Sequence, residues 1–183
     1  MKRTLLFSSI IILISCARPI EQEDGTDSPY ANLPDLNWEK GIEIVTWNIE
    51  VFPKSGQITT DKVAMIIKAL NADIFCLQEM SSESAFNRLA EQLEDYTAVF
   101  STATRYSNLA ILYKKDSFSV NKQSNVLSNH TYEFAYRPPL RLDMTFTDGQ
   151  ETDFTLINVH LKCCGSGFSR RKASAELLHQ YLI

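Results

Sequence analysis

The 183-residue sequence is short of positive charge, and this limits how it can meet nucleic acids. It holds 18 lysine and arginine residues against 22 aspartate and glutamate residues, a formal net charge of −4 at pH 7. A protein of this balance lacks the basic surface that binds nucleic acid tightly and without sequence preference. A nucleic-acid substrate is still compatible with the sequence, because bound cations can reverse the field at a site.

Cysteine and histidine are also scarce, with four and three residues respectively. Cys76 lies in the apolar run DIFCLQE and is expected to be a small buried hydrophobic residue. No second Cys/His pair stands at metal-ligand spacing, which argues against a zinc site. The adjacent Cys163 and Cys164 are not expected to bond each other, because a disulfide between neighbours closes a strained ring.

The apolar stretch at the N-terminus is too short to span a bilayer comfortably, and no later stretch is long and apolar enough. MKR followed by LLFSSIIILI is typical of an export signal, and it ends in LISC, which resembles the bacterial lipoprotein box. Residues 1–16 are therefore predicted to be a lipoprotein signal peptide, with Cys16 as the lipidated residue. This places the protein in the bacterial cell envelope, lipid-anchored and facing the periplasm or the exterior. The alternative is an ordinary secretory signal with an incidental cysteine.

Residues 17–40 combine acidic residues, three prolines and almost no periodicity. Such a composition is typical of a flexible tether, here between a lipid anchor and a domain. An ordered arm is the alternative near Leu36 and Trp38, whose side chains can pack on a domain edge.

From residue 41 onward one domain is expected, without internal repeats. Apolar residues alternate between strand and helix spacing in the order strand, helix, strand, helix, followed by a run of strands and a final helix. Thr59 or Thr60 is the expected N-cap of the first helix and Ser82 that of the second. This order indicates mixed sheets covered by helices. We expect strands at 42–49, 73–78, 96–101, 108–114, 117–126, 139–147 and 153–161, and helices at 59–70, 82–93 and from about 169.

Polar side chains end the first two strands. Asn48 and Glu50 follow the apolar run IEIV in TWNIE, and Glu79 ends the second strand in LQE. Two parallel strands joined by one helix are expected to be neighbours, so their carboxyl ends can converge on one site. Amide and carboxylate oxygens there suit a hard cation such as Mg²⁺. The alternatives are a strand that runs out into solvent and a solvated or helix-capping carboxylate.

Two later stretches add polar groups to apolar surroundings. Alternation in LINVHLK puts Asn158 and His160 on one face of a strand, where burial without partners is costly. In YRPP, two prolines stiffen the chain after Arg137, which helps an arginine that must point at an anion. The structural alternatives are a hydrogen-bonded core histidine and a surface arginine.

Taken together, W-N-x-E, L-Q-E, R-x-P and N-x-H in this order resemble the endonuclease/exonuclease/phosphatase superfamily, over about residues 42–182. The resemblance implies a four-layered α/β sandwich, two packed mixed β-sheets flanked by helices. It implies that Glu79 is the acidic metal ligand, that Asn48 helps to hold the metal or its waters, and that the cofactor is Mg²⁺ or Mn²⁺. It implies that His160 binds a phosphate oxygen and Arg137 supports the phosphate, with Asn158 beside them among the catalytic residues.

The sequence departs from that superfamily in its last motifs. The G-D-x-N and S-D-H-like motifs, which supply the water-orienting aspartate and the catalytic histidine, are absent from these residues. We therefore expect residues 41–183 to be the N-terminal part of such a domain only, and the chain as given to be inactive.

The resemblance leaves the substrate open. The first hypothesis is a surface-anchored, metal-dependent phosphodiester hydrolase, namely a DNase I-like endonuclease with nucleic acid as its substrate. The protein is expected to be monomeric. The second is a phospholipid or sugar-phosphate phosphoesterase of the same fold, which a lipid anchor beside a membrane favours. The third is a truncated, non-catalytic domain that only binds.

Overall fold

The computed structural model describes residues 30, 33–36, 41–147 and 151–183. The predicted signal peptide with Cys16, most of the predicted tether and Trp38 lie outside these residues. Within the described part of the chain, no helix is both long enough and apolar enough to cross a membrane.

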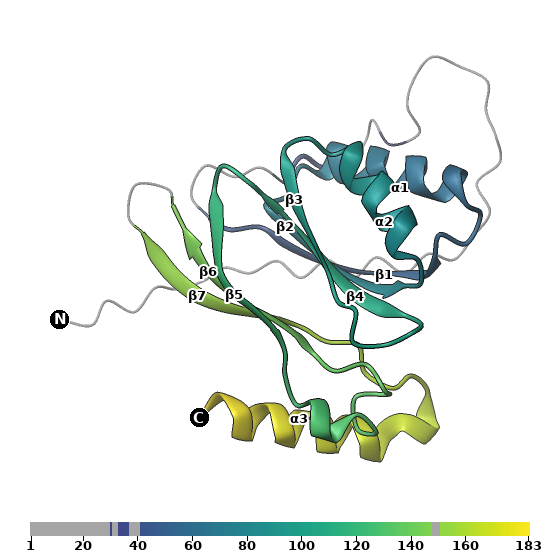
Figure 1. Cartoon of the computed structure of the whole chain (residues 1–183), viewed down its shortest axis with the longest axis vertical. Helices are drawn as coiled ribbons and strands as arrows, with labels where there is room; N and C mark the ends of the chain where they lie inside the picture. The colour runs from purple at the N-terminus through teal and green to yellow at the C-terminus, as the bar shows by residue number, and fades with distance from the viewer. Residues whose placement is uncertain (1–29, 31–32, 37–40, 148–150) are drawn as a thin grey trace.

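The first half of the domain forms a four-stranded mixed sheet in the order β1-β2-β4-β3. β1 and β2 run parallel, as predicted, because helix α1 crosses over between them, whereas β4 is antiparallel to both of its neighbours. Helices α1 and α2 cover one face of this sheet (Figure 1). The elements are β1 (Ile44–Phe52), α1 (Gln57–Leu70), β2 (Ile74–Met80), α2 (Glu83–Glu91), β3 (Tyr96–Phe100) and β4 (Asn108–Lys114).

The second half forms a three-stranded sheet in the order β5-β6-β7. Its described strands are antiparallel throughout, because none of them is joined by a helical crossover. The prediction of mixed sheets therefore holds for the first sheet, and the second is antiparallel. The elements are β5 (Phe118–Asn125), β6 (Leu140–Phe146), β7 (Thr152–Asn158) and α3 (Phe168–Leu182), with short 3-10 turns at η1 (Ser128–His130) and η2 (Gly165–Gly167).

The two sheets pack face to face, and helices lie outside both, which confirms the predicted layered α/β sandwich. Strand β2 shows the arrangement best because it is buried on both faces. Phe75 and Leu77 join the core beneath α1 and α2, whereas Ile74 and Cys76 join the core between the sheets. The alternation of side chains along one strand thus connects the two cores. Cys76 is a buried, unpaired thiol, as expected.

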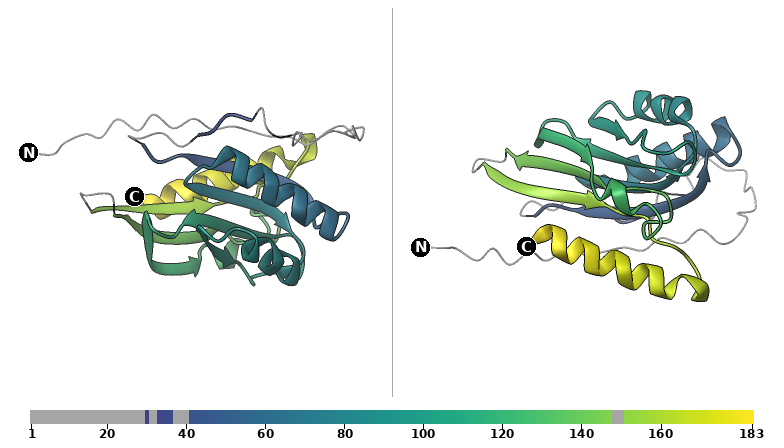
Figure 2. Two further views of the ribbon diagram at one scale, coloured as in Figure 1. Left: turned by 90° about the horizontal axis from the view of Figure 1, so that it is seen from above. Right: turned by 60° about the horizontal axis from the view of Figure 1, so that its bottom comes forward.

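The last helix, α3, lies along the outer face of the second sheet (Figure 2). Its described contacts are largely polar. Arg141 of β6 donates to the hydroxyl of Tyr181, and the hydroxyl of Ser174 donates to the carbonyl of Glu133 at 2.9 Å. Ser174 is the one buried residue of this helix.

The helix starts agree with the sequence at one of two positions. Ser82 caps α2, with its hydroxyl accepting the Ala85 N–H at 3.3 Å. The predicted cap at Thr59 or Thr60 is wrong, because α1 begins at Gln57 and its N-cap is Gly56, with φ +62°. Glycine adopts this left-handed backbone without the penalty of a Cβ, so the helix can begin earlier than the threonines indicate.

Part of the predicted tether touches the domain. Leu33 and Leu36 pack against the core beneath the helices, and the Leu36 N–H donates to the Leu70 carbonyl at 2.8 Å. This short stretch matches the ordered arm that the sequence offered as an alternative near Leu36.

Candidate active site

The ends of β1 and β2 bulge at the same level. Asn48 pairs with Gln78 and Phe52 with Met80, so three residues of β1 face a single residue of β2 between these pairs. Bulges of this kind bend a strand and redirect its side chains, and they are common beside active sites. The backbone is left-handed here, with φ +50° at Glu50, +60° at Val51 and +61° at Glu79. Backbone of this type is costly for side-chain-bearing residues and often marks functional sites.

The bulge brings a carboxylate and an amide together. Glu79 accepts the side-chain N–H of Asn48 with one oxygen and the backbone N–H of Val51 with the other, both at 3.1 Å. The amide oxygen of Asn48 accepts the Glu50 N–H at 2.9 Å. Asn48 and Glu79 therefore meet as predicted from the parallel strands. The Glu50 side chain points away and pairs with Lys54 at 2.9 Å.

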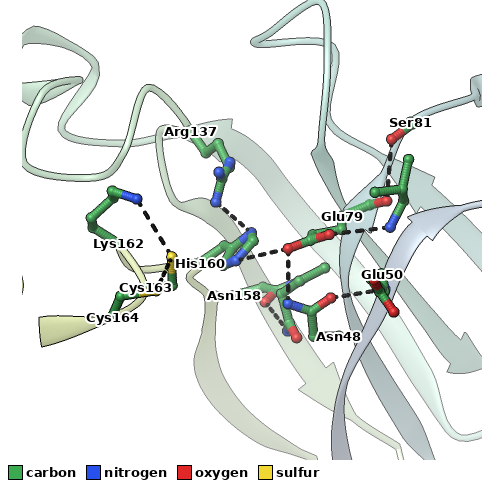
Figure 3. A network of polar contacts seen from close by, with 12 residues as sticks. Asn48, Glu50, Glu79, Ser81, Arg137, Asn158, His160, Lys162, Cys163 and Cys164 are labelled. Carbon is green, nitrogen blue, oxygen red and sulfur yellow. Dashed lines mark hydrogen bonds and ion pairs between the residues drawn. The ribbon is translucent and has the colours of Figure 1, made fainter. Parts of the chain in front are cut away.

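On the other side of Glu79 lies His160, which the structure joins to Arg137 (Figure 3). Arg137 Nη1 lies 2.7 Å from His160 Nδ1. Because a guanidinium can only donate, Nδ1 must be the unprotonated acceptor, and a neutral His160 then carries its proton on Nε2. His160 Nε2 lies 3.6 Å from Glu79 Oε1. Arg137, His160, Glu79 and Asn48 thus form one continuous line.

Burial and charge agree with the neutral form of the histidine. Burial of the ring lowers the pKa of His160 from 6.5 to about 4, the positive charge of Arg137 acts in the same direction, and Glu79 opposes both. The contact between His160 and Glu79 is therefore one of a neutral imidazole with a carboxylate rather than an ion pair. Burial also lowers the pKa of Arg137, and the charge of Glu79 partly offsets this.

A tight loop holds Arg137 in place. Phe134 is fully buried beneath it, and the Arg137 N–H donates to the Phe134 carbonyl at 3.0 Å. The following Pro138 and Pro139 are both buried, and the Pro139 carbonyl accepts the Val126 N–H at 3.0 Å. This loop therefore fixes the direction from which Arg137 approaches the histidine.

Asn158 lies next to this line but faces the interior. Its amide N–H groups donate to the carbonyls of Leu77 and Ala110 at 3.0 and 3.1 Å, and its oxygen accepts from Gln78 Nε2 at 2.9 Å. The side chain thus links β7 of the second sheet to β2 and β4 of the first. With both ends of the amide bound to protein groups, Asn158 is placed to position the site rather than to touch a substrate.

Gln78 is the site residue that the sequence reasoning missed. Only 5% exposed, it also donates to the Thr46 hydroxyl at 3.0 Å, and it directly precedes Glu79. The signal for it was present, because a glutamine within the buried run IFCLQEM needs a hydrogen-bond partner. The partner, Asn158, is 80 residues away, and nothing local in the sequence identifies it.

The donor set is compatible with a magnesium-type ion at Glu79. Among the described residues no three His, Cys, Asp or Glu side chains gather into a metal-binding group. Mg²⁺ does not require such a cage, because proteins commonly hold it by one or two carboxylates, with water and substrate phosphate completing the shell. The Glu79 side chain is 22% exposed and each of its oxygens accepts one hydrogen bond of 3.1 Å, which leaves lone pairs for an ion. Asn48 turns its nitrogen to this carboxylate and so orients it.

We predict that Gln78 and Asn158 stabilise the fold as a unit. Replacing either by alanine leaves buried polar groups unsatisfied, at about 1–3 kcal/mol for each such group. The double variant should lose less stability than the sum of the single variants, with a coupling of about 0.5–3 kcal/mol. Urea unfolding followed by circular dichroism measures this, with exposed Gln123→Ala of β5 as the neutral control. Strictly additive losses would contradict the bridge.

We predict that His160 stays neutral in the metal-free protein until the pH falls to about 4, with its proton on Nε2. NMR of the ¹⁵N-labelled imidazole in the presence of a chelator reports both the titration and the tautomer. Since the unfolded chain binds this proton near pH 6.5, the contribution of His160 to stability is complete above that pH and declines from 6.5 toward 4. Arg137→Met should raise the midpoint because it removes a neighbouring positive charge. A midpoint near 6.5 in the unaltered protein would refute this assignment.

Comparison with known proteins agrees with the fold. The chain resembles crystal structures of truncated Caenorhabditis elegans TDP2, with 23% identity and a TM-score of 0.62, and of D. rerio TDP2 complexed with single-strand DNA product, with 17% identity and a TM-score of 0.62. A third is a mannosyl-6-phosphatase from Bacteroides thetaiotaomicron, with 16% identity and a TM-score of 0.57. Each match covers 76% of this chain, and 54%, 53% and 58% of the respective structures.

The chain therefore spans about half the length of the structures it matches, and at these identities the likeness concerns the fold. No curated protein sequence gives a significant match. A family profile described as Endonuclease/Exonuclease/phosphatase family matches residues 45–152, more than half of the chain and an interval that contains Asn48, Glu79 and Arg137. The chain belongs to the endonuclease/exonuclease/phosphatase family.

Proposed function

We propose that this chain supplies the metal- and phosphate-binding side of a metal-dependent phosphodiester hydrolase. The observation that carries the proposal is the line of Arg137, His160, Glu79 and Asn48. It places a cationic group, a neutral donor and an anionic group next to one another, with 2.7 Å from Arg137 to His160 and 3.6 Å from His160 to Glu79. A phosphodiester needs the same three elements, a cation for its oxygens, donors for the remaining oxygen, and a carboxylate that holds the cation.

In this proposal Glu79 holds Mg²⁺ or Mn²⁺, and Asn48 keeps the carboxylate in position and contacts the waters of the ion. The metal, when bound, supplies charge neutralisation at the phosphate and at the leaving oxygen. His160 offers its Nε2–H to a phosphate oxygen. Arg137 donates one N–H to His160, and its other N–H groups remain as donors for the anion. Asn158 fixes the end of β7, from which His160 follows.

Water activation is not assigned to any residue of this chain. The G-D-x-N and S-D-H-like motifs that the family resemblance calls for do not occur in the 183 residues. We therefore propose residues 41–183 as the part of the domain that binds metal and phosphate, and binding is the property that tests it.

Nucleic acid is the substrate that we favour. Tyr132 and Tyr136 are 57% and 62% exposed, and the Arg170 guanidinium lies over the Tyr132 ring, 4.2 Å from its centroid. Tyr136 directly precedes Arg137. Exposed aromatic faces with arginine beside a phosphate site are what unpaired bases stack on. A similar structure, that of D. rerio TDP2, was solved with single-strand DNA product.

Two alternatives have support of their own. The similarity to a mannosyl-6-phosphatase favours a sugar phosphate, whose ring can also pack on a tyrosine. A lipid anchor would bring the site to a membrane surface and favours a phospholipid. A domain that binds these ligands without hydrolysis is the third possibility, and turnover separates it from the other two.

We predict that Glu79→Gln weakens Mn²⁺ binding by roughly 10–100-fold or more, because it removes the charge and replaces one of the two accepting oxygens by an amide nitrogen, while it keeps the shape of the side chain. Electron paramagnetic resonance of free Mn²⁺ measures the affinity, and Glu50→Gln is the matched control, since Glu50 points away. Mn²⁺ should also strengthen binding of a fluorescent single-stranded oligonucleotide in the unaltered protein. Equal Mn²⁺ affinity in both variants would remove Glu79 from the site. Retention on anionic vesicles without oligonucleotide binding would favour the phospholipid alternative.

We also propose that Cys16 anchors the protein to the bacterial cell envelope, facing the periplasm or the exterior. The support is the sequence LISC after a short apolar segment. Cys16→Ser should abolish incorporation of a radioactive fatty acid and release the protein from the membrane fraction. Equal labelling of the two proteins would contradict the anchor.

A further inference from the structure

Two adjacent thiols lie just beyond the candidate active site. The Cys164 thiol donates to Cys163 Sγ at 3.0 Å, and Lys162 Nζ lies 3.4 Å from the same sulfur. Both cysteines are exposed, in contrast to Cys76, the other cysteine that the structure describes. In Figure 3 the pair lies on the opposite side of His160 from Glu79.

The loop that carries the thiols is held by α3. Arg171 Nη1 donates to the carbonyls of Lys162 and Cys164, both at 2.8 Å, and the Gly167 N–H donates to the Cys164 carbonyl at 3.1 Å. A Cβ on Gly167 would lie 2.8 Å from both the Lys162 carbonyl and Arg171 Nη1, so only glycine permits this approach. The arrangement of Lys162, Cys163 and Cys164 is therefore a built feature of the fold.

We propose that Cys163 and Cys164 form a thiol–disulfide exchange site, in which Cys163 attacks a small-molecule disulfide and Cys164 resolves the adduct. The two sulfurs have different surroundings. Cys163 accepts hydrogen bonds from Cys164 and Lys162, which favour its thiolate, whereas Cys164 is the donor. These two hydrogen bonds lower the pKa of Cys163, with the bond from Cys164 as the largest cause, and the hydrogen bond to Cys163 raises the pKa of Cys164. Exposed, electropositive surroundings of this type mark reactive cysteines.

A low-molecular-weight disulfide is the oxidant in this exchange. The Cys163 thiolate attacks one sulfur of that disulfide, forms a mixed disulfide and expels the first small thiolate, which takes up a proton. Cys164 then loses its proton, attacks Cys163 Sγ and expels the second small thiolate. The protein gives up two protons and two electrons, and the small disulfide is reduced to two thiols.

The disulfide between Cys163 and Cys164 is better suited to reversible exchange than to a permanent structural role. Neighbouring Cα atoms across a trans peptide are about 3.8 Å apart, shorter than the about 4.4–6.8 Å that most disulfides span. A bond between adjacent cysteines is therefore strained, and strained, exposed disulfides are the easily reduced ones. The strain that argued against a permanent bond in the sequence thus favours a reversible one.

The exchange would change the electrostatic surroundings of the neighbouring candidate active site. Burial lowers the pKa of the Arg137 guanidinium, and a negatively charged Cys163 thiolate acts in the opposite direction. Closing the disulfide removes this charge. The exchange chemistry itself does not depend on hydrolase activity, and it can be tested without it.

In the test, the reduced full chain in a Cys16→Ser background is treated with oxidised glutathione at neutral pH in the presence of a chelator. The intact mass is then measured and the modified peptides are mapped. The protein should lose two hydrogens, retain no glutathione and link Cys163 to Cys164. Cys164→Ser should retain one glutathione on Cys163. Cys163→Ser should react at about one tenth of the rate of the protein with both cysteines, or more slowly still. Lys162→Met should slow the first step, whereas Lys172→Met, which removes a charge from nearby α3, should not.

Circular dichroism of each variant confirms that it is folded. Three results would overturn the proposal: glutathione retained on the protein that keeps both cysteines, equal rates for the two serine variants, or no reaction of the folded chain while the urea-unfolded chain reacts.

Discussion

The carboxylate of Glu79 is the group on which the geometry of the site depends. It receives the amide of Asn48 from β1 and the backbone N–H of Val51 beyond it, and it faces His160 from the second sheet. These contacts exist because β1 and β2 bulge at the same level, where the backbone turns left-handed at Glu50, Val51 and Glu79. Without the bulge, strict alternation would direct Glu79 to the same face as Leu77, into the core beneath the helices.

Two buried amides connect this arrangement to the rest of the fold. Gln78 and Asn158 bind each other and the carbonyls of Leu77 and Ala110, so β2, β4 and β7 are joined directly beneath the carboxylate. A fully satisfied polar network in a core fixes the relative position of its elements more specifically than apolar packing does. The distance between Glu79 and His160 follows from how the two sheets are joined at this point.

The elements themselves could be predicted from the sequence because their signals are local. Alternation and helical spacing gave every described strand and helix to within a few residues, and the crossover placed Asn48 beside Glu79. The link between Gln78 and Asn158 spans 80 residues and joins the two sheets, so it depends on how one sheet packs on the other, which periodicity within a strand does not contain. The link between Arg137 and His160 spans 23 residues within the second sheet, and it depends on the register of β6 and β7, in which Leu140 pairs with Asn158. The bulge was hidden for a related reason, since its two extra residues look like a loss of alternation.

The central claim is that a divalent ion binds at Glu79, directly beside His160. Paramagnetic broadening tests it most directly, because Mn²⁺ broadens NMR signals only of nearby nuclei. With substoichiometric Mn²⁺, the account predicts that the His160 ring and the Asn48 side-chain amide broaden first, while the rings of His130 and His179 stay sharp. Earlier broadening of His130 or His179, or equal broadening of all three histidines, would contradict it.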